Sequence, residues 1–282
     1  MIVAAAFLYS TGMMLFRWRG YLKNRAVYNE ASSSFTQPAS TGQGSASGQA
    51  TQTGTDEPSG KEGDGEIGEV IATEIAEEDA DCAPIEVDFD ALRAINRDVI
   101  GWVYCKDSMI NYPVVHCTDN ETYLSLDYQR RYSSSGSIFT DMSNRPGFQD
   151  YNVIMYGHRM LDKSMFGTLI KWQNQEWFDN HAVMWLLTPD QDYRVVLFSC
   201  YTTSATSDTY QVYLEQREDF IDYLEKMKSL SKIPRDVEMD PEAHYVLLST
   251  CAYNFQNART VLHGMLVPVS SAGGVKFEDM TP

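Results

Sequence analysis

The sequence predicts a mainly β protein in which about eight short strands form a barrel or a sandwich. Closely spaced short strands are typical of these folds, whereas a βαβ fold requires a helix between consecutive strands. A hydrophobic content of 43% with 12% aromatic residues is sufficient for the core of such a domain. The apolar runs that predict the strands read GWVYC, INYPVVH, GSIFTD, YNVIMYG, AVMWLLTP, DYRVVLFSCYTT, HYVLLSTC and RTVLHGMLVPV.

Two helical segments accompany these strands. Apolar residues recur at helical spacing from Phe89 to Val99, and Asp88 or Asp90 is placed to cap a short amphipathic helix there. Further on, residues 215–232 (EQREDFIDYLEKMKSLSK) place apolar side chains on one helical face and charges on the other. This second pattern predicts a long helix inserted between two strands.

The first 28 residues predict a membrane anchor followed by a basic juxtamembrane segment. MIVAAAFLYSTGMMLF is uncharged and largely apolar, and RWRGYLKNR follows it. A helix of that length reaches roughly 24 Å, and reading on through Trp18 brings it close to a bilayer core of about 30 Å. The alternative is a signal peptide, but neither a basic start nor a small-x-small cleavage site is clear. Basic residues after the apolar segment would by themselves leave the C-terminal part in the cytoplasm, unless basic residues precede residue 1.

Residues 29–84 predict a disordered linker, rich in Ser, Gly and Thr and then acidic. The net charge of −17 is concentrated in the second half of this linker and just after it, because fourteen acidic residues and one basic residue, Lys61, lie from Asp56 to Asp90. No basic patch with interleaved aromatic residues occurs, which argues against nucleic acid as a partner. Residues 85–272 then form the folded domain, and residues 273–282 form a C-terminal tail.

Five cysteines leave at least one thiol free if the protein is exported. Their spacing matches no zinc motif. Cys200 lies inside an apolar strand and is expected to be a small buried hydrophobe. Cys105 and Cys117 flank a predicted hairpin, and the sequence leaves open whether they form a disulfide. Cys82 lies in the acidic linker.

Three side chains with complementary chemistry stand at strand ends. Cys251 ends the run HYVLLSTC, His158 follows the run YNVIMYG, and Arg259 opens the last strand. A Cys nucleophile, a His general acid or base and an Arg that stabilises an oxyanion form a workable acyl-transfer set. Arg259 and a protonated His158 would both favour the thiolate form of Cys251.

The remaining histidines are interpreted as structural. His116, His181 and His244 stand at the edges of predicted elements. His263 lies in the middle of the last strand and is the alternative candidate base.

The three motifs together resemble those of the sortases, cysteine transpeptidases of Gram-positive cell surfaces, and in detail those of class B. The nucleophile strand T-L-x-T-C of that family here reads LLSTC, with Leu247 where Thr is usual. YGH at 156–158 resembles the histidine motif, and NARTVLHG at 257–264 resembles the arginine strand. GSIFTD, MFGTL and the long helix at 215–232 are also similar to class B, and the resemblance covers roughly residues 85–270.

The resemblance implies a closed barrel and a reaction. Cys251 would cleave a C-terminal sorting signal after Thr, and an amine of the cell wall precursor would resolve the thioacyl enzyme. The catalytic barrel would lie outside the cell on a single-pass membrane anchor, and neither a cofactor nor a metal is implied. By matching position, the substrate-binding residues would be Asn120, Leu124, Tyr210, Ser249 and Thr250, although Leu124 is also interpretable as core and Asn120 as a turn residue.

Four alternatives remain. A peptidoglycan L,D-transpeptidase is disfavoured, because it requires a His two residues before the Cys and an Arg soon after it. A secreted cysteine peptidase would hydrolyse the same intermediate with water. A pilin polymerase of class B type would use a lysine side chain as the amine. A catalytically silent module would bind surface peptides without cleaving them.

Overall fold

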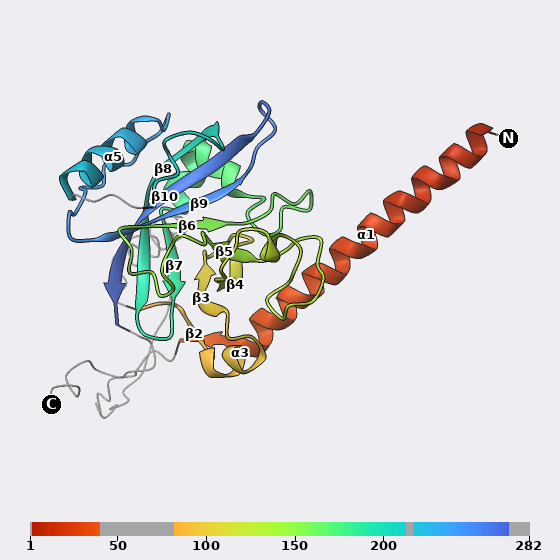
Figure 1. Ribbon diagram of the computed structural model, residues 1–282, viewed down its shortest axis with the longest axis horizontal. Coiled ribbons are helices and arrows are strands. Elements are labelled where there is room, and N and C mark those ends of the chain that lie inside the picture. Colours follow the sequence, from red (N-terminus) through yellow and green to blue (C-terminus); the bar gives the residue numbers. More distant parts are fainter. Residues whose placement is uncertain (1, 40–81, 213–216, 271–282) are drawn as a thin grey trace, which may run out of the picture.

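The computed structural model describes residues 2–39, 82–212 and 217–270. Its centre is a closed barrel, with helix α5 against one side and helix α1 projecting away from the other (Figure 1). The barrel contains eight strands in the order β10-β8-β7-β3-β4-β5-β6-β9. Their bounds are β3 Val99–Tyr104, β4 Asn111–Val115, β5 Ile138–Thr140, β6 Asn152–Tyr156, β7 Val183–Leu187, β8 Asp192–Ser204, β9 His244–Cys251 and β10 Ala258–Val269.

Each of the eight predicted apolar runs supplies one strand, so the predicted mainly β barrel is confirmed. Most pairings are antiparallel, but β6 pairs parallel to β9 and β4 pairs parallel to β5. The core is filled by large side chains, among which Trp102, Trp172 and Trp185 are at most 2% exposed. Because closure pairs the strands at both edges, no barrel strand is left with an open edge.

The short helices lie at the periphery of the barrel. α3 begins after Asp88, whose carboxylate accepts a hydrogen bond from the backbone N–H of Ala91 (2.9 Å), as predicted. The helix is shorter than we expected, because Asn96 adopts extended backbone and uses its amide to hold the Tyr128 carbonyl (2.7 Å). Val99 consequently begins β3. The bounds are α3 Phe89–Ile95, η1 Thr122–Leu124, η2 Leu169–Gln173 and α4 Gln175–Asn180.

Helix α5, Arg217–Ser229, is the predicted insertion between β8 and the nucleophile strand β9. Its apolar face buries Phe220, Leu224 and Met227 completely. These side chains form a second hydrophobic cluster with aromatic residues of the barrel wall, including Phe198 and Tyr245. The helix therefore covers the outer side of β8 and β9 near the strand that carries Cys251.

The segment after residue 28 differs from its prediction. Helix α1 runs from Ile2–Phe35 and is followed by β1, Thr36–Pro38, which pairs antiparallel with β2, Ile85–Val87. Residues 29–38 are thus helix and strand rather than linker, because Tyr28 and Ala31 are buried against the barrel and fix this end of the helix. Pro38 pairs with Ile85, so the chain leaves and re-enters the fold at adjacent positions.

Most of the predicted linker, residues 40–81, and the predicted tail, residues 273–282, lie outside the described residues. Within the ranges that are described, no helix has the length and hydropathy that crossing a membrane requires. The membrane anchor over residues 1–28 stays a prediction.

All five cysteines belong to described segments and carry free thiols. The disulfide that we left open between Cys105 and Cys117 is therefore absent. Cys200 is 1% exposed, as predicted for a small buried hydrophobe. Burial raises the pKa of its thiol well above the usual range, so Cys200 is chemically inert.

His263 is a core residue. It is 1% exposed, stacks on the ring of Tyr201, and has its Nε2 3.1 Å from the Tyr201 hydroxyl. It does not line the groove described below, so our alternative assignment of His263 as the base is wrong.

The buried, neutral His263 is expected to make the stability of the fold sensitive to acid. Burial lowers the pKa of His263 to about 3, whereas histidine in an unfolded chain titrates near 6.5. The unfolded state therefore binds an extra proton between these two pH values, and stability falls as the pH drops below about 6.5. At pH 5 this one group is expected to lower the free energy of unfolding by about 2 kcal/mol. Urea unfolding at pH 8 and pH 5 measures the loss.

The control is His263→Phe, which keeps an aromatic ring but cannot take up a proton. Its loss of stability between pH 8 and pH 5 should be smaller than that of the wild type by about the same 2 kcal/mol. An identical loss in both proteins would show that another group carries the acid sensitivity.

Candidate active site

The barrel topology brings the three strand-end residues together. Strand β9 lies between β6 and β10, so Cys251 at its end has a neighbour on each side. Across the antiparallel β9–β10 pair, Arg259 is the direct partner of Cys251. On the other side, parallel pairing of Tyr156 with Ser249 places the end of β6, and therefore His158, beside the end of β9.

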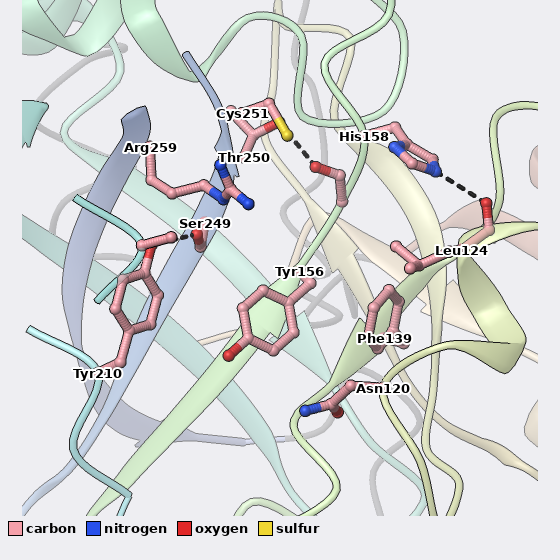
Figure 2. Close-up of a pocket in the computed structure, with 12 residues that line it drawn as sticks. Asn120, Leu124, Phe139, Tyr156, His158, Tyr210, Ser249, Thr250, Cys251 and Arg259 are labelled. Carbon is pink, nitrogen blue, oxygen red and sulfur yellow. Dashed lines mark hydrogen bonds between the residues drawn. The ribbon is translucent and has the colours of Figure 1, made fainter. Parts of the chain in front are cut away.

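These residues open onto a groove of about 350 Å³. Except for the alternative base His263, every site residue that the sequence suggested lines this groove. The full lining comprises Asn120, Leu124, Phe139, Tyr156, Gly157, His158, Ala205, Tyr210, Ser249, Thr250, Cys251 and Arg259. Figure 2 shows Cys251 at one end of the groove, with Arg259 and His158 on opposite sides of it.

His158 is held by a backbone carbonyl. Its Nε2 lies 2.8 Å from the carbonyl oxygen of Leu124, in η1 (Figure 2). A carbonyl oxygen only accepts hydrogen bonds, so Nε2 carries the proton and donates it. The other ring nitrogen, Nδ1, faces the Cys251 side in Figure 2 and is the nitrogen that remains free to exchange a proton.

The opposite wall combines a cation with two aromatic rings. Figure 2 shows the guanidinium group of Arg259 pointing into the groove near Ser249. The hydroxyl of Tyr210 lies 2.8 Å from the Ser249 hydroxyl, and its ring stacks on Tyr156 with centroids 6.5 Å apart. Burial raises the pKa of Tyr210 while Arg259 opposes the rise, so Tyr210 stays protonated and polar beside a positive charge.

A buried carboxylate organises the lower part of the groove. Asp141, 8% exposed, accepts hydrogen bonds from the Asn120 amide (2.9 Å) and the Tyr156 hydroxyl (2.9 Å). The side-chain oxygen Oδ1 of Asn120 in turn accepts a hydrogen bond from the backbone N–H of Met142 (2.8 Å), which fixes the orientation of the side-chain amide. Burial, with the charge of Asp141, raises the pKa of Tyr156, so this phenol acts only as a neutral donor.

The hydroxyl of Thr250 is already hydrogen-bonded within the protein. It is 3% exposed, and its hydroxyl donates to the carbonyl oxygen of Gly157 (2.7 Å). The backbone N–H of Gly157 also donates to the Ser249 carbonyl (3.1 Å). Thr250 therefore ties the histidine turn to the nucleophile strand rather than offering a free group to a ligand.

Leu124 and Asn120 both line the groove, and Leu124 is 42% exposed and therefore not a core residue. Their role in substrate binding stays a prediction. Two further residues at the groove, Tyr156 and Asp141, were not predicted from the sequence. Tyr156 stands two residues before His158, within the YGH motif, and this position could have signalled it. Asp141 directly follows the buried strand in GSIFTD and is itself buried. A buried carboxylate needs hydrogen-bond donors, and its position after a buried strand could have indicated this.

Metal chemistry has no visible site in this groove. Across the described part of the chain, no group of three or more His, Cys, Asp or Glu side chains is arranged to hold a metal ion. The chemistry available is that of a thiol, an imidazole with one free nitrogen and a guanidinium group, arranged around a partly apolar groove of peptide size. This set can perform nucleophilic acyl transfer with proton exchange and oxyanion stabilisation.

Comparisons with known proteins identify relatives that share this architecture. No protein-family model matches the chain. It is 35% identical over 180 residues to Sortase B of Listeria monocytogenes, a match that covers 62% of this chain and 72% of the relative. It is 31% identical over 184 residues to Sortase B of Staphylococcus aureus, covering 64% and 75%. A crystal structure of sortase B from Bacillus anthracis superposes with a TM-score of 0.59 at 36% identity, covering 64% of this chain and 84% of that one.

Proposed function

This chain belongs to the sortase B family, and we propose that it is a cysteine transpeptidase that cleaves a C-terminal sorting signal after threonine. The observation that carries the proposal is the convergence of Cys251, His158 and Arg259 at one end of a peptide-sized groove. The identity to proteins named Sortase B supports the reaction class. The individual roles below follow from the geometry and from acyl-transfer chemistry.

In the first half-reaction, the sulfur of Cys251 attacks the carbonyl carbon of the threonine. The carbonyl oxygen becomes an oxyanion, and the guanidinium group of Arg259, on the neighbouring strand, is the cation placed to stabilise it. Collapse of the tetrahedral intermediate breaks the C–N bond and leaves a thioester between threonine and Cys251. The amine of the released tail takes up a proton as it leaves.

His158 is the group that handles this proton. Its Nε2–H is committed to Leu124, so proton exchange takes place at Nδ1. A protonated Nδ1 donates to the leaving amine and then, as a base, accepts a proton from the incoming amine. The incoming amine attacks the thioester and forms a new amide with the threonine, while the C–S bond breaks and Cys251 leaves as a thiolate beside the reprotonated His158.

The rest of the groove would bind the sorting signal upstream of the scissile bond. Leu124 offers exposed apolar surface, and the stacked rings of Tyr156 and Tyr210 form a flat wall. Asn120 keeps one N–H for a peptide carbonyl, because Asp141 holds the amide by its other N–H. Ser249 supplies a hydroxyl next to the nucleophile.

The proposed partners rest on membership of the sortase B family and not on the geometry of the groove. The donor is a surface protein that carries the sorting signal, and the acceptor is an amine of the peptidoglycan precursor. The catalytic barrel then acts outside the cell, with the N-terminal segment as a membrane anchor. A pilin polymerase would use the same donor chemistry with a lysine side chain as acceptor, so the acceptor distinguishes the two functions.

A transpeptidation assay tests the proposal. The full chain is offered sorting-signal peptides of the LPxTG, NPxTN and PPxTG kinds with a glycine peptide, a diaminopimelate peptide or a lysine peptide. We expect mass spectrometry to find cleavage after threonine and an amide between that threonine and one of the amines. Without amine, slow hydrolysis should yield the free threonine acid. If the chain binds sorting-signal peptides but cleaves none of them, the result would instead support a silent peptide-binding module.

A further inference from the structure

We propose that Tyr28 of helix α1 is a positioning residue for His158, so that the docked end of this helix is a structural part of the active site. The inference rests on the proposed catalytic role of His158. Two separate series of contacts lead from Tyr28 to the histidine. One reaches its ring, and the other reaches its backbone.

The first series begins at the Tyr28 hydroxyl. It donates a hydrogen bond to the carbonyl oxygen of Gly136 and lies 3.4 Å from the Ser137 hydroxyl. Tyr28 is 5% exposed, and burial raises the pKa of its phenol, so the hydroxyl keeps its proton and remains a donor. A side chain of α1 therefore holds the turn at residues 133–137.

That turn packs directly on the carbonyl that holds His158. Gly136 has a φ of +56°, and a Cβ placed on it would lie 2.5 Å from the Tyr123 carbonyl oxygen and 2.8 Å from that of Leu124. The backbone N–H of Ser137 donates to the same Tyr123 carbonyl (2.9 Å). The position of η1 is thus set by this turn, and the Leu124 carbonyl accepts from His158 Nε2.

The second series passes through Tyr112 on β4. The ring of Tyr28 meets the ring of Tyr112 edge-on, with centroids 5.3 Å apart. The Tyr112 hydroxyl accepts a hydrogen bond from the backbone N–H of Met165 (3.0 Å). The next residue, Phe166, donates its N–H to the carbonyl of His158 (3.1 Å).

Tyr28 consequently supports both the backbone of His158 and the acceptor that orients its imidazole. Apart from β4, the segments that link Tyr28 to His158 are the 3-10 helix η1 and the turns at residues 133–137 and 163–166, which have few internal hydrogen bonds and depend on their neighbours for position. If Tyr28 loses its hydroxyl, we expect the Leu124 carbonyl to shift and the imidazole to sample orientations in which Nδ1 no longer faces Cys251. Figure 2 shows the hydrogen bond by which the Leu124 carbonyl holds the imidazole.

The test is Tyr28→Phe in the full chain, which removes one oxygen and keeps the ring contact with Tyr112. We expect kcat for transpeptidation to fall about tenfold, with KM within about twofold of the wild type, because the reacting groups are misplaced while the groove is intact. Ser32→Ala is the matched control. It removes another contact between α1 and the barrel, the hydrogen bond from Asn111 (2.7 Å), which has no route to Leu124. Ser32→Ala should keep wild-type kcat.

A second readout does not depend on activity. Nitrogen-15 NMR of the imidazoles should show His158 of the wild type as a single Nε2–H tautomer, and His158→Ala identifies its signals. In Tyr28→Phe we expect these signals to shift toward exchange between both tautomers, and in Ser32→Ala we expect no shift. An unchanged spectrum and an unchanged kcat in Tyr28→Phe would overturn the inference. A shifted spectrum in an enzyme that tolerates His158→Ala would instead uphold the coupling and refute the proposed role of His158.

Discussion

Cys251→Ala is expected to abolish both cleavage of the sorting signal and its transfer to an amine. Alanine has no nucleophilic side chain, and among the described residues that line the groove Cys251 is the only cysteine. We expect kcat/KM to fall by at least about 10⁴-fold, as for other covalent catalysts that lose their nucleophile. Peptide binding, measured by fluorescence anisotropy, should change little because the groove wall is intact.

Cys82→Ala is the control for this variant. Cys82 carries an exposed free thiol, and its backbone forms an isolated parallel β-bridge with Ser270, beyond the end of β10 that is remote from Arg259. It should retain full activity and full sensitivity to alkylating reagents. Substantial turnover by Cys251→Ala would contradict the assignment of the nucleophile.

His158→Ala is expected to give the second large effect, a fall of about 10³-fold in kcat/KM for a peptide substrate. Without the imidazole, the leaving amine must depart without a general acid. The loss of activity is expected to depend on the leaving group of the substrate. A thioester analogue of the sorting signal, whose leaving group departs without protonation, should acylate the variant at a rate close to that of the wild type.

The control is His244→Ala, at the other end of the nucleophile strand. His244 places its Nδ1 3.0 Å from the Asp150 carbonyl and does not line the groove. It should process the peptide and the thioester normally. If His158→Ala loses both substrates equally, the histidine is required for the fold of the groove or for the thiolate and not for protonating the leaving group.

The proposed catalytic set could be read from the sequence because each member stands at the end of an apolar run. Cys251, His158 and Arg259 are separated by up to 101 residues, yet strand ends are where a barrel displays side chains. Sequence patterns alone did not reveal the parallel pairing of β6 with β9, which decides that His158 and Cys251 share one end of the barrel. The resemblance to sortases supplied that missing step.

The support for the site was less readable, because much of it is backbone. His158 is oriented by the carbonyl of Leu124, and any residue at position 124 would provide that oxygen. The role of position 124 in orienting His158 therefore depends on where the backbone runs and not on the leucine side chain. Asp141 was overlooked for a different reason, since its partners Asn120 and Tyr156 come from distant segments.

The docking of α1 did leave a sequence signal. Tyr28, Ala31 and Phe35 are spaced by three and four residues, as expected for one face of a helix, and the first two are buried against the barrel. The Ser-rich composition from residue 31 onward obscured this pattern. Three apolar positions in a polar stretch are a weak signal until tertiary contacts stabilise the helix.

The most direct measurement of the central claim is the mass of the reaction intermediate. The wild-type chain is mixed with its preferred sorting-signal peptide without amine, quenched in acid and analysed intact and after digestion. The account predicts an added mass equal to the peptide up to and including threonine, located on Cys251 and lost when amine is supplied. It is contradicted if the peptide is converted while Cys251 carries no adduct and stays fully open to iodoacetamide.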